Sequence, residues 1–195
     1  MKNESWLKNN SKTLIMVGMH RSGSSLIARI FYEWGVNLGK DLMKSDIANE
    51  EGFYENWDFV NLNNQLLSEK GGSWNYPVMI EKPDKRCKEL IEKHKDILWG
   101  WKDNRTAFTF KAYQPYLENV LFVICKRNKE AIIKSLMRTH KGQFRKEDQN
   151  EEYFGKLHDM YYAAIDEISK NYPRVDIRYE DLVETKYFNS KLRHF

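Results

Sequence analysis

The segment Gly18–Ser25, which reads Gly-Met-His-Arg-Ser-Gly-Ser-Ser, joins a short apolar stretch to a helical pattern. A loop between a strand and a helix turns several backbone N–H groups toward one anion, and the helix N-terminus adds partial positive charge. Both glycines fit the nucleotide-binding pattern GxxxxGK[ST], but Ser24 stands at the lysine position and the cation is Arg21. The segment therefore predicts a phosphate site unlike that of a P-loop kinase, whose lysine holds the β- and γ-phosphates. The alternative is a serine-rich turn without a ligand.

A second candidate anion site follows the apolar run Val120–Cys125. This run leads into Lys126-Arg-Asn128, and Ser135 comes eight residues after Arg127. An arginine at the end of a strand and a serine two turns into the next helix present a guanidinium and a hydroxyl to the same place. The other interpretation is an ordinary surface arginine and a helical serine.

Apolar patterning indicates which elements hold these residues. It predicts strands at 13–17, 97–102, 119–126 and 175–179, and helices at 24–34, 58–70, 84–95, 131–139 and 151–170. Continuous apolar strands that alternate with helices are typical of an α/β fold with a parallel sheet covered on both faces. Ligands of such sheets bind beyond the carboxyl ends of the strands. We therefore expect the site at 18–25, 102–105, 127 and 179–181.

Length and composition limit the number of domains and the kinds of partner. With 195 residues, 41% of them hydrophobic, the chain is expected to form a single domain over 1–195 with a sizeable core. A formal net charge of +4 suits an anionic ligand and falls short of a nucleic-acid footprint, so we expect no nucleic-acid partner. The longest apolar run is too short to span a bilayer. Two cysteines outside any ligand pattern indicate free thiols and a cytoplasmic location.

Taken in order, these motifs resemble the sulfotransferases that use 3′-phosphoadenosine 5′-phosphosulfate (PAPS), and most of all the bacterial members. The loop motif of that family is matched by Arg21–Ser25, and its strand ending in Arg-Asn, with a serine eight residues after the arginine, by Arg127 and Ser135. Further matches are Gly52–Glu55, Trp99–Arg105 and Tyr179–Leu182. The resemblance covers roughly residues 13–182. Two departures are Asn104 and Lys129, which stand where many relatives have proline.

The resemblance implies a three-layer P-loop-like fold and the transfer of a sulfuryl group from PAPS to a hydroxyl or amine, which leaves 3′-phosphoadenosine 5′-phosphate (PAP). It implies a 5′-phosphate site made of Arg21, Ser22, Gly23, Ser24 and Ser25, and a 3′-phosphate site made of Arg127 and Ser135. Arg21 is then expected to stabilise charge on the leaving oxygen, and no metal is required. A small molecule, a carbohydrate or a lipid is the expected acceptor.

The general base is left open among three residues. Glu55 lies in the segment that relatives place near the acceptor, Asp103 follows the second predicted strand, and His20 belongs to the loop and has the pKa best suited to the task. For Asp103 the alternative is a structural ion pair with Lys102 or Arg105. Tyr179 is expected either against adenine or in the core. Trp74, Trp99 and Trp101 are expected in an aromatic core, with an acceptor pocket as the alternative.

Two other functions compete with sulfuryl transfer. One is a P-loop-type nucleoside or small-molecule kinase, against which the serine at position 24 argues. The other is a non-catalytic relative that still binds a nucleotide. The oligomeric state is not indicated by the sequence.

Overall fold

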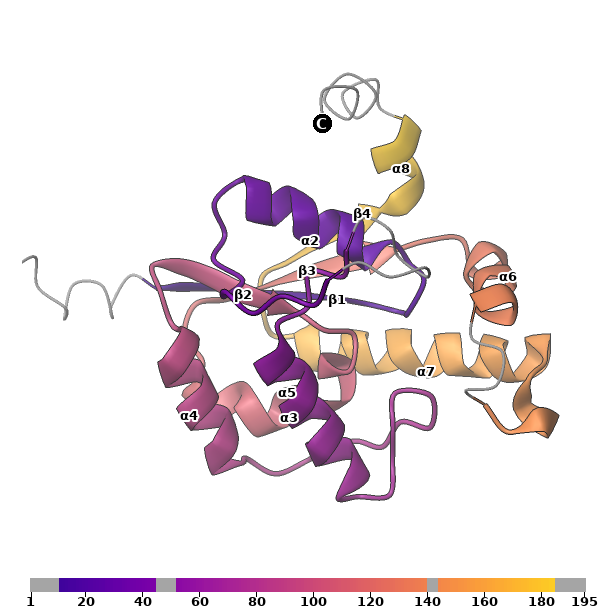
Figure 1. Ribbon diagram of the computed structural model, residues 1–195, viewed down its shortest axis with the longest axis horizontal. Coiled ribbons are helices and arrows are strands. Elements are labelled where there is room, and N and C mark those ends of the chain that lie inside the picture. The colour runs from indigo at the N-terminus through magenta and orange to yellow at the C-terminus, as the bar shows by residue number, and fades with distance from the viewer. Residues whose placement is uncertain (1–10, 45–51, 140–143, 185–195) are drawn as a thin grey trace, which may run out of the picture.

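A computed structural model describes residues 11–44, 52–139 and 144–184 of the chain. The elements are β1 (Lys12–Gly18), α2 (Ser24–Glu33), α3 (Trp57–Ser68), α4 (Lys85–His94), β2 (Leu98–Lys102), α5 (Thr106–Tyr113), η1 (Gln114–Tyr116), β3 (Val120–Lys126), α6 (Lys129–Thr139), η2 (Lys146–Asp148), α7 (Glu151–Ser169), β4 (Arg174–Arg178) and α8 (Tyr179–Glu184). The fold is α/β, with helices on both faces of a central sheet (Figure 1). None of the helices described has the length and apolar character needed to cross a membrane.

The sheet is four-stranded, and every pair of neighbouring strands is parallel, in the order β2-β1-β3-β4. Met16 pairs with Lys102, Gly18 with Cys125, and Lys126 with Arg178. The strands therefore end at one edge of the sheet, as the sequence predicts. The outer strand β4 differs from the prediction of covered strands, since four of its five residues are exposed. Its charged residues suit the edge of a sheet.

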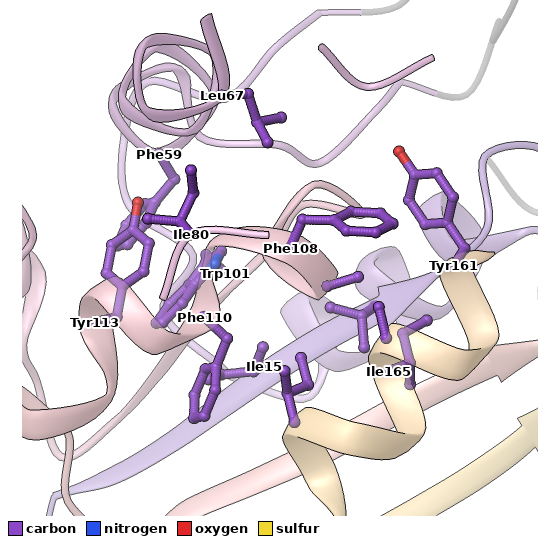
Figure 2. Close-up of a cluster of buried hydrophobic side chains, with 14 of the residues drawn as sticks. Ile15, Phe59, Leu67, Ile80, Trp101, Phe108, Phe110, Tyr113, Tyr161 and Ile165 are labelled. Carbon is purple, nitrogen blue, oxygen red and sulfur yellow. The ribbon is translucent and has the colours of Figure 1, made fainter. Parts of the chain in front are cut away.

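Two apolar layers enclose the sheet. On one face, α2 packs Ile27 and Ala28 against Leu14, Met16 and other residues of β1 and β3. The other face carries α3, α4, α5 and α7 and holds the larger core (Figure 1). Figure 2 shows its aromatic centre, where Phe59 stacks on Trp101 with ring centroids 4.5 Å apart. Trp99 and Trp101 are both buried there, so the core interpretation is confirmed for these two residues.

Most predicted elements occur within a few residues of their predicted limits, and two helices are additional. Helix α5 is not predicted from the sequence, because it is buried almost all round and so lacks an amphipathic period. Helix α8 is not predicted either: Tyr179 begins this helix, whereas the sequence predicts that the last strand ends there. Side chains cap four of the predicted helices, Asn56 on α3, Asp84 on α4, Asn128 on α6 and Asn150 on α7. These caps explain why the starts of these helices are readable from the sequence.

Gly100 gives a test of how closely β2 and β1 approach. A methyl group at this position would lie 2.0 Å from the carbonyl oxygen of Leu14, and the Gly100 N–H donates to Asn37 O at 3.1 Å on the other side. We expect Gly100→Ala to lower the free energy of unfolding by about 1–3 kcal/mol, because the backbone on both sides leaves no room to relax. The control is Gly155→Ala in α7, where the new methyl meets Lys129 Cε at 3.7 Å. That change is expected to raise stability by about 0.5–1 kcal/mol. Urea unfolding measures both, and a neutral Gly100→Ala contradicts the packing argument.

Candidate functional site

The loop between β1 and α2 has a backbone shaped for close approach to an anion. Arg21 has φ 69° and Gly23 has φ 92°, both in the left-handed region. A non-glycine residue in that region costs free energy and is found preferentially at functional sites. No side chain caps α2, whose N-cap is Gly23. The N–H groups of its first turn, with Ser24 and Ser25, therefore lie at the carboxyl edge of the sheet without the capping side-chain oxygen that α3, α4 and α7 have.

Ser22 supports the loop from below. It has no exposed surface, its N–H donates to Met19 O at 3.0 Å, and its carbonyl accepts from the Cys125 thiol at 3.2 Å. Burial raises the pKa of Cys125 to about 12, so this thiol stays protonated and keeps donating. The Ser22 Oγ lies beside Gly18, 2.7 Å from where a methyl group there would sit. The hydroxyl has no hydrogen-bond partner among the described residues, and phosphate binding by Ser22 stays a prediction.

Tyr179 covers the loop glycine. A methyl group on Gly23 would lie 2.2 Å from the Tyr179 ring, so the ring packs directly on the loop backbone and a larger residue has no space there. The Arg127 guanidinium carbon lies 4.4 Å from the centroid of the same ring, a cation–π contact. Tyr179 is half-buried. The ring thus joins α8 to the two arginine-bearing segments and is not part of the main core.

The two candidate anion sites lie next to each other. Arg21 Nε donates to Ser135 Oγ at 3.0 Å, and Arg127 NH1 donates to the Arg21 carbonyl at 2.9 Å. The Asn128 side chain accepts from Ala131 N at 2.9 Å and so caps α6, which sets the direction in which Ser135 faces. The guanidinium groups of Arg21 and Arg127 and the buried hydroxyl of Ser135 thus meet beside the loop, although Arg21 is more than 100 positions from the other two residues.

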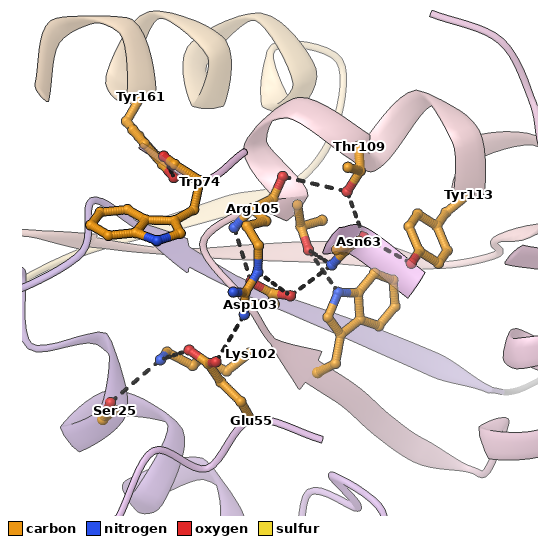
Figure 3. Close-up of polar contacts among 12 residues, drawn as sticks. Ser25, Glu55, Asn63, Trp74, Lys102, Asp103, Arg105, Thr109, Tyr113 and Tyr161 are labelled. Atoms are coloured by element: carbon orange, nitrogen blue, oxygen red, sulfur yellow. Dashed lines mark hydrogen bonds and ion pairs between the residues drawn. The ribbon is translucent and has the colours of Figure 1, made fainter. Parts of the chain in front are cut away.

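A third cation reaches the loop from β2. The Lys102 side chain is buried, forms an ion pair with Glu55 Oε1, and lies with its Nζ 3.4 Å from Ser25 Oγ (Figure 3). Residue 102 lies at the edge expected from the sequence, where its suggested role is an ion pair with Asp103; the structure pairs it with Glu55 instead. The signal for it is the position of the lysine as the last residue of a strand that is otherwise buried and apolar. Lys102 brings an ammonium group to the start of α2, where the loop itself has a serine.

Glu55 and Asp103, two of the three candidate bases, belong to one buried ionic cluster. Arg105 joins them: its NH2 donates to Glu55 Oε2 at 3.0 Å and its Nε to Asp103 Oδ1 at 2.8 Å. Asn63 Nδ2 donates to Asp103 Oδ2 at 2.8 Å. Burial raises the pKa of Asp103 above its ordinary value, although Arg105 opposes this. With both oxygens engaged and no exposed surface, Asp103 has the geometry of a structural ion pair, which does not support its role as a base.

His20, the third candidate base, lies among aromatic rings. Its ring centroid is 4.5 Å from that of Trp74 and 5.6 Å from that of Tyr161, the latter in an edge arrangement. Trp74 is half-buried, and Phe144 packs on it in an edge arrangement with centroids 5.3 Å apart. Trp74 therefore lies beside the loop, unlike the two core tryptophans. It remains a candidate for contact with an acceptor.

Comparison with known proteins does not identify a family. No family model matches the chain, and no curated protein matches it. Among solved structures, the deoxyadenosine kinase from M. mycoides with bound dATP superimposes with a TM-score of 0.45 and 14% sequence identity, over 93% of this chain and 99% of that one. A likeness this distant carries no inference about ligand or reaction. The P-loop-like arrangement, a parallel sheet whose first strand leads through a glycine loop into a helix, stands on the structure itself.

Proposed function

We propose that the protein transfers a sulfuryl group from PAPS to a hydroxyl or amine of an acceptor. The observation that carries this proposal is the contact between the two candidate anion sites, in which Arg21 donates to Ser135 and Arg127 donates to Arg21. A nucleoside with phosphate groups on both its 3′ and 5′ positions needs two neighbouring anion sites. This site offers the start of α2 for one group, and Arg127 with Ser135 for the other.

The residues of the loop fit the donor's charge. The start of α2 lacks a side-chain cap, and two cations, Arg21 and Lys102, lie beside it. When bound, PAPS supplies an activated sulfuryl group on a phosphate oxygen that leaves with negative charge. Arg21 and Lys102, which lie beside the start of α2, would stabilise the charge that grows on that oxygen. Because arginine keeps its proton, Arg21 does so by charge and hydrogen bonding. Glu55, beside Lys102, takes the acceptor's proton in this scheme.

A P-loop-type nucleoside or small-molecule kinase is the second candidate, and Lys102 is the observation that favours it. A lysine with its Nζ near Ser25 supplies a cation at the loop, a role that the lysine of the nucleotide-binding pattern has in kinases. The second arginine, Arg127, favours a donor with an additional 3′-phosphate instead. A non-catalytic nucleotide-binding relative has the same anion sites and differs in lacking turnover.

Calorimetry distinguishes the two donors. We expect PAP to bind in the presence of a metal chelator, and ATP with magnesium to bind at least tenfold more weakly. ATP with magnesium binding more tightly than PAP overturns the proposal in favour of the kinase. Release of PAP from PAPS in the presence of candidate acceptors, followed by chromatography, then tests turnover and separates an enzyme from a binding protein.

Arg127→Ala is expected to weaken PAP binding roughly ten- to a hundredfold while adenosine 5′-phosphate, which lacks the 3′-phosphate, loses little. A charge-assisted hydrogen bond contributes about 1.5–3 kcal/mol, which corresponds to that range. The control is Arg174→Ala, which removes an exposed arginine at the opposite end of β4 that pairs with Asp166 and Asp176. Calorimetry with both nucleotides measures the difference. Equal losses for the two nucleotides contradict the assignment of Arg127 to the 3′-phosphate.

A further inference from the structure

Lys102 has two kinds of partner within reach of one ammonium group. On one side is the carboxylate of Glu55, and on the other is the hydroxyl of Ser25, whose oxygen is 3.4 Å from Nζ. The contact with Ser25 is at the outer limit of a hydrogen bond, so the ion pair with Glu55 dominates in this state. Ser25 belongs to the first turn of α2, where the donor's 5′-phosphate is expected.

The other side of Glu55 is held firmly. Its second oxygen accepts from Arg105, and Arg105 is tied to Asp103 through its own N–H at 3.0 Å and its Nε at 2.8 Å. Asp103 is fixed in turn by the side-chain amide of Asn63. The Oδ1 of that amide accepts hydrogen bonds from Thr109 Oγ1 at 2.7 Å and from Tyr113 OH at 2.9 Å (Figure 3). The carboxylate of Glu55 is therefore anchored through one oxygen. The lysine on the other oxygen, at the end of a flexible stem, is the partner that can leave.

The charges of the cluster balance without a ligand. Lys102 and Arg105 face Glu55, Asp103 lies behind Arg105, and Tyr161 of α7 is also near the cluster. Burial raises the pKa of Tyr161 well above its ordinary value, so this phenol stays neutral. Two cations thus meet two carboxylates in a buried place where an uncompensated charge is costly. An anion at the start of α2 adds a competitor for Lys102.

We propose that the donor's 5′-phosphate and Glu55 compete for Lys102, so that donor binding frees Glu55 to receive the acceptor's proton. This inference rests on the proposed function. The acceptor oxygen forms a bond to sulfur, and the bond from sulfur to the bridging phosphate oxygen breaks. The acceptor's proton goes to Glu55 Oε1, and the electron pair stays on the phosphate oxygen beside Lys102. The base therefore becomes available only after the donor is in place, and the donor must bind before the acceptor reacts.

Glu55→Gln is expected to tighten PAP binding about tenfold, equivalent to about 1.4 kcal/mol, because Lys102 no longer has a competing carboxylate. The same variant should lose turnover, since glutamine keeps the size of glutamate without its basicity. Lys102→Met is expected to weaken PAP binding, and the double variant should bind no more tightly than Lys102→Met alone. The control is Glu118→Gln, which breaks an exposed ion pair with Lys95 and should leave affinity unchanged. Calorimetry measures all four, and thermal unfolding checks that each is folded.

Unchanged or weaker PAP binding by Glu55→Gln overturns the competition, as does tightening that persists without Lys102. Glu55→Asp provides the test if Glu55→Gln does not fold, because it keeps the charge but reaches less far, and it should tighten binding to a smaller degree. Inorganic pyrophosphate separates this inference from the proposed function. If pyrophosphate affinities follow the expected order while ATP with magnesium binds better than PAP, the competition for Lys102 stands and the sulfotransferase proposal fails.

Discussion

Replacing Arg21 with alanine is expected to lower the rate of sulfuryl transfer by about 10²–10³, with a smaller loss of donor binding. The guanidinium lies at the bend of the loop, and its Nε contacts Ser135. Its contribution is greatest when negative charge reaches the leaving oxygen, so the transition state loses more than the ground state does. Removing one such hydrogen-bond donor from a preorganised active site typically lowers the rate by this factor.

Two readouts are needed to separate rate from binding. Hydrolysis of PAPS, with water as the acceptor, reports turnover before an acceptor is known, and calorimetry with PAP reports affinity. Arg21→Lys is the matched variant, since it keeps a positive charge but loses the fork that reaches Ser135, and it should recover part of the rate. If affinity falls by the same factor as rate in Arg21→Ala, the residue is an anchor for the donor and the assigned role is wrong.

Arg105→Met is expected to destabilise the fold by about 3–5 kcal/mol, the largest effect on stability among these changes. The substitution leaves the carboxylate of Asp103 fully buried without its cation and takes one of two partners from Glu55. Removing one member of a buried ion pair costs this much because the remaining charge has lost the compensation for its desolvation. Arg105→Met should also disturb donor binding, since Glu55 loses its anchor.

The chain contains a matched control for this prediction. Arg86 joins Asp84 and Glu69 through the same pattern of contacts, with its N–H and Nε on the aspartate two residues earlier and its guanidinium on a glutamate. That arginine is far more accessible to solvent: its side chain is 38% exposed, against 8% for Arg105. Arg86→Met should therefore cost far less in urea unfolding, because water and salt screen an exposed pair. Equal losses for the two variants contradict the argument from burial.

The sequence by itself determined most of the secondary structure, α5 and α8 excepted, and the edge at which the site forms. A strand such as Val120–Cys125 is recognised by its run of apolar residues, and a helix start by its capping residue. Both signals lie within a few consecutive residues. The parallel order of the strands then brings their carboxyl ends together. Helix α5 could not be predicted in this way, since a helix buried on almost all sides shows no periodic pattern of apolar residues.

Only the tertiary structure decided which charged groups meet at that edge. The contact of Arg21 with Ser135 spans 114 positions, and that of Lys102 with Glu55 spans 47. Such pairs depend on strand register and on which side chains the core excludes from water, and neither is encoded in local spacing. Glu55 and Asp103 are both buried and differ in their partners, because Asp103 is enclosed by Arg105 and Asn63 while Glu55 shares a lysine with the loop. Spacing determines the types of groups at the site, whereas packing determines which partner neutralises each charge.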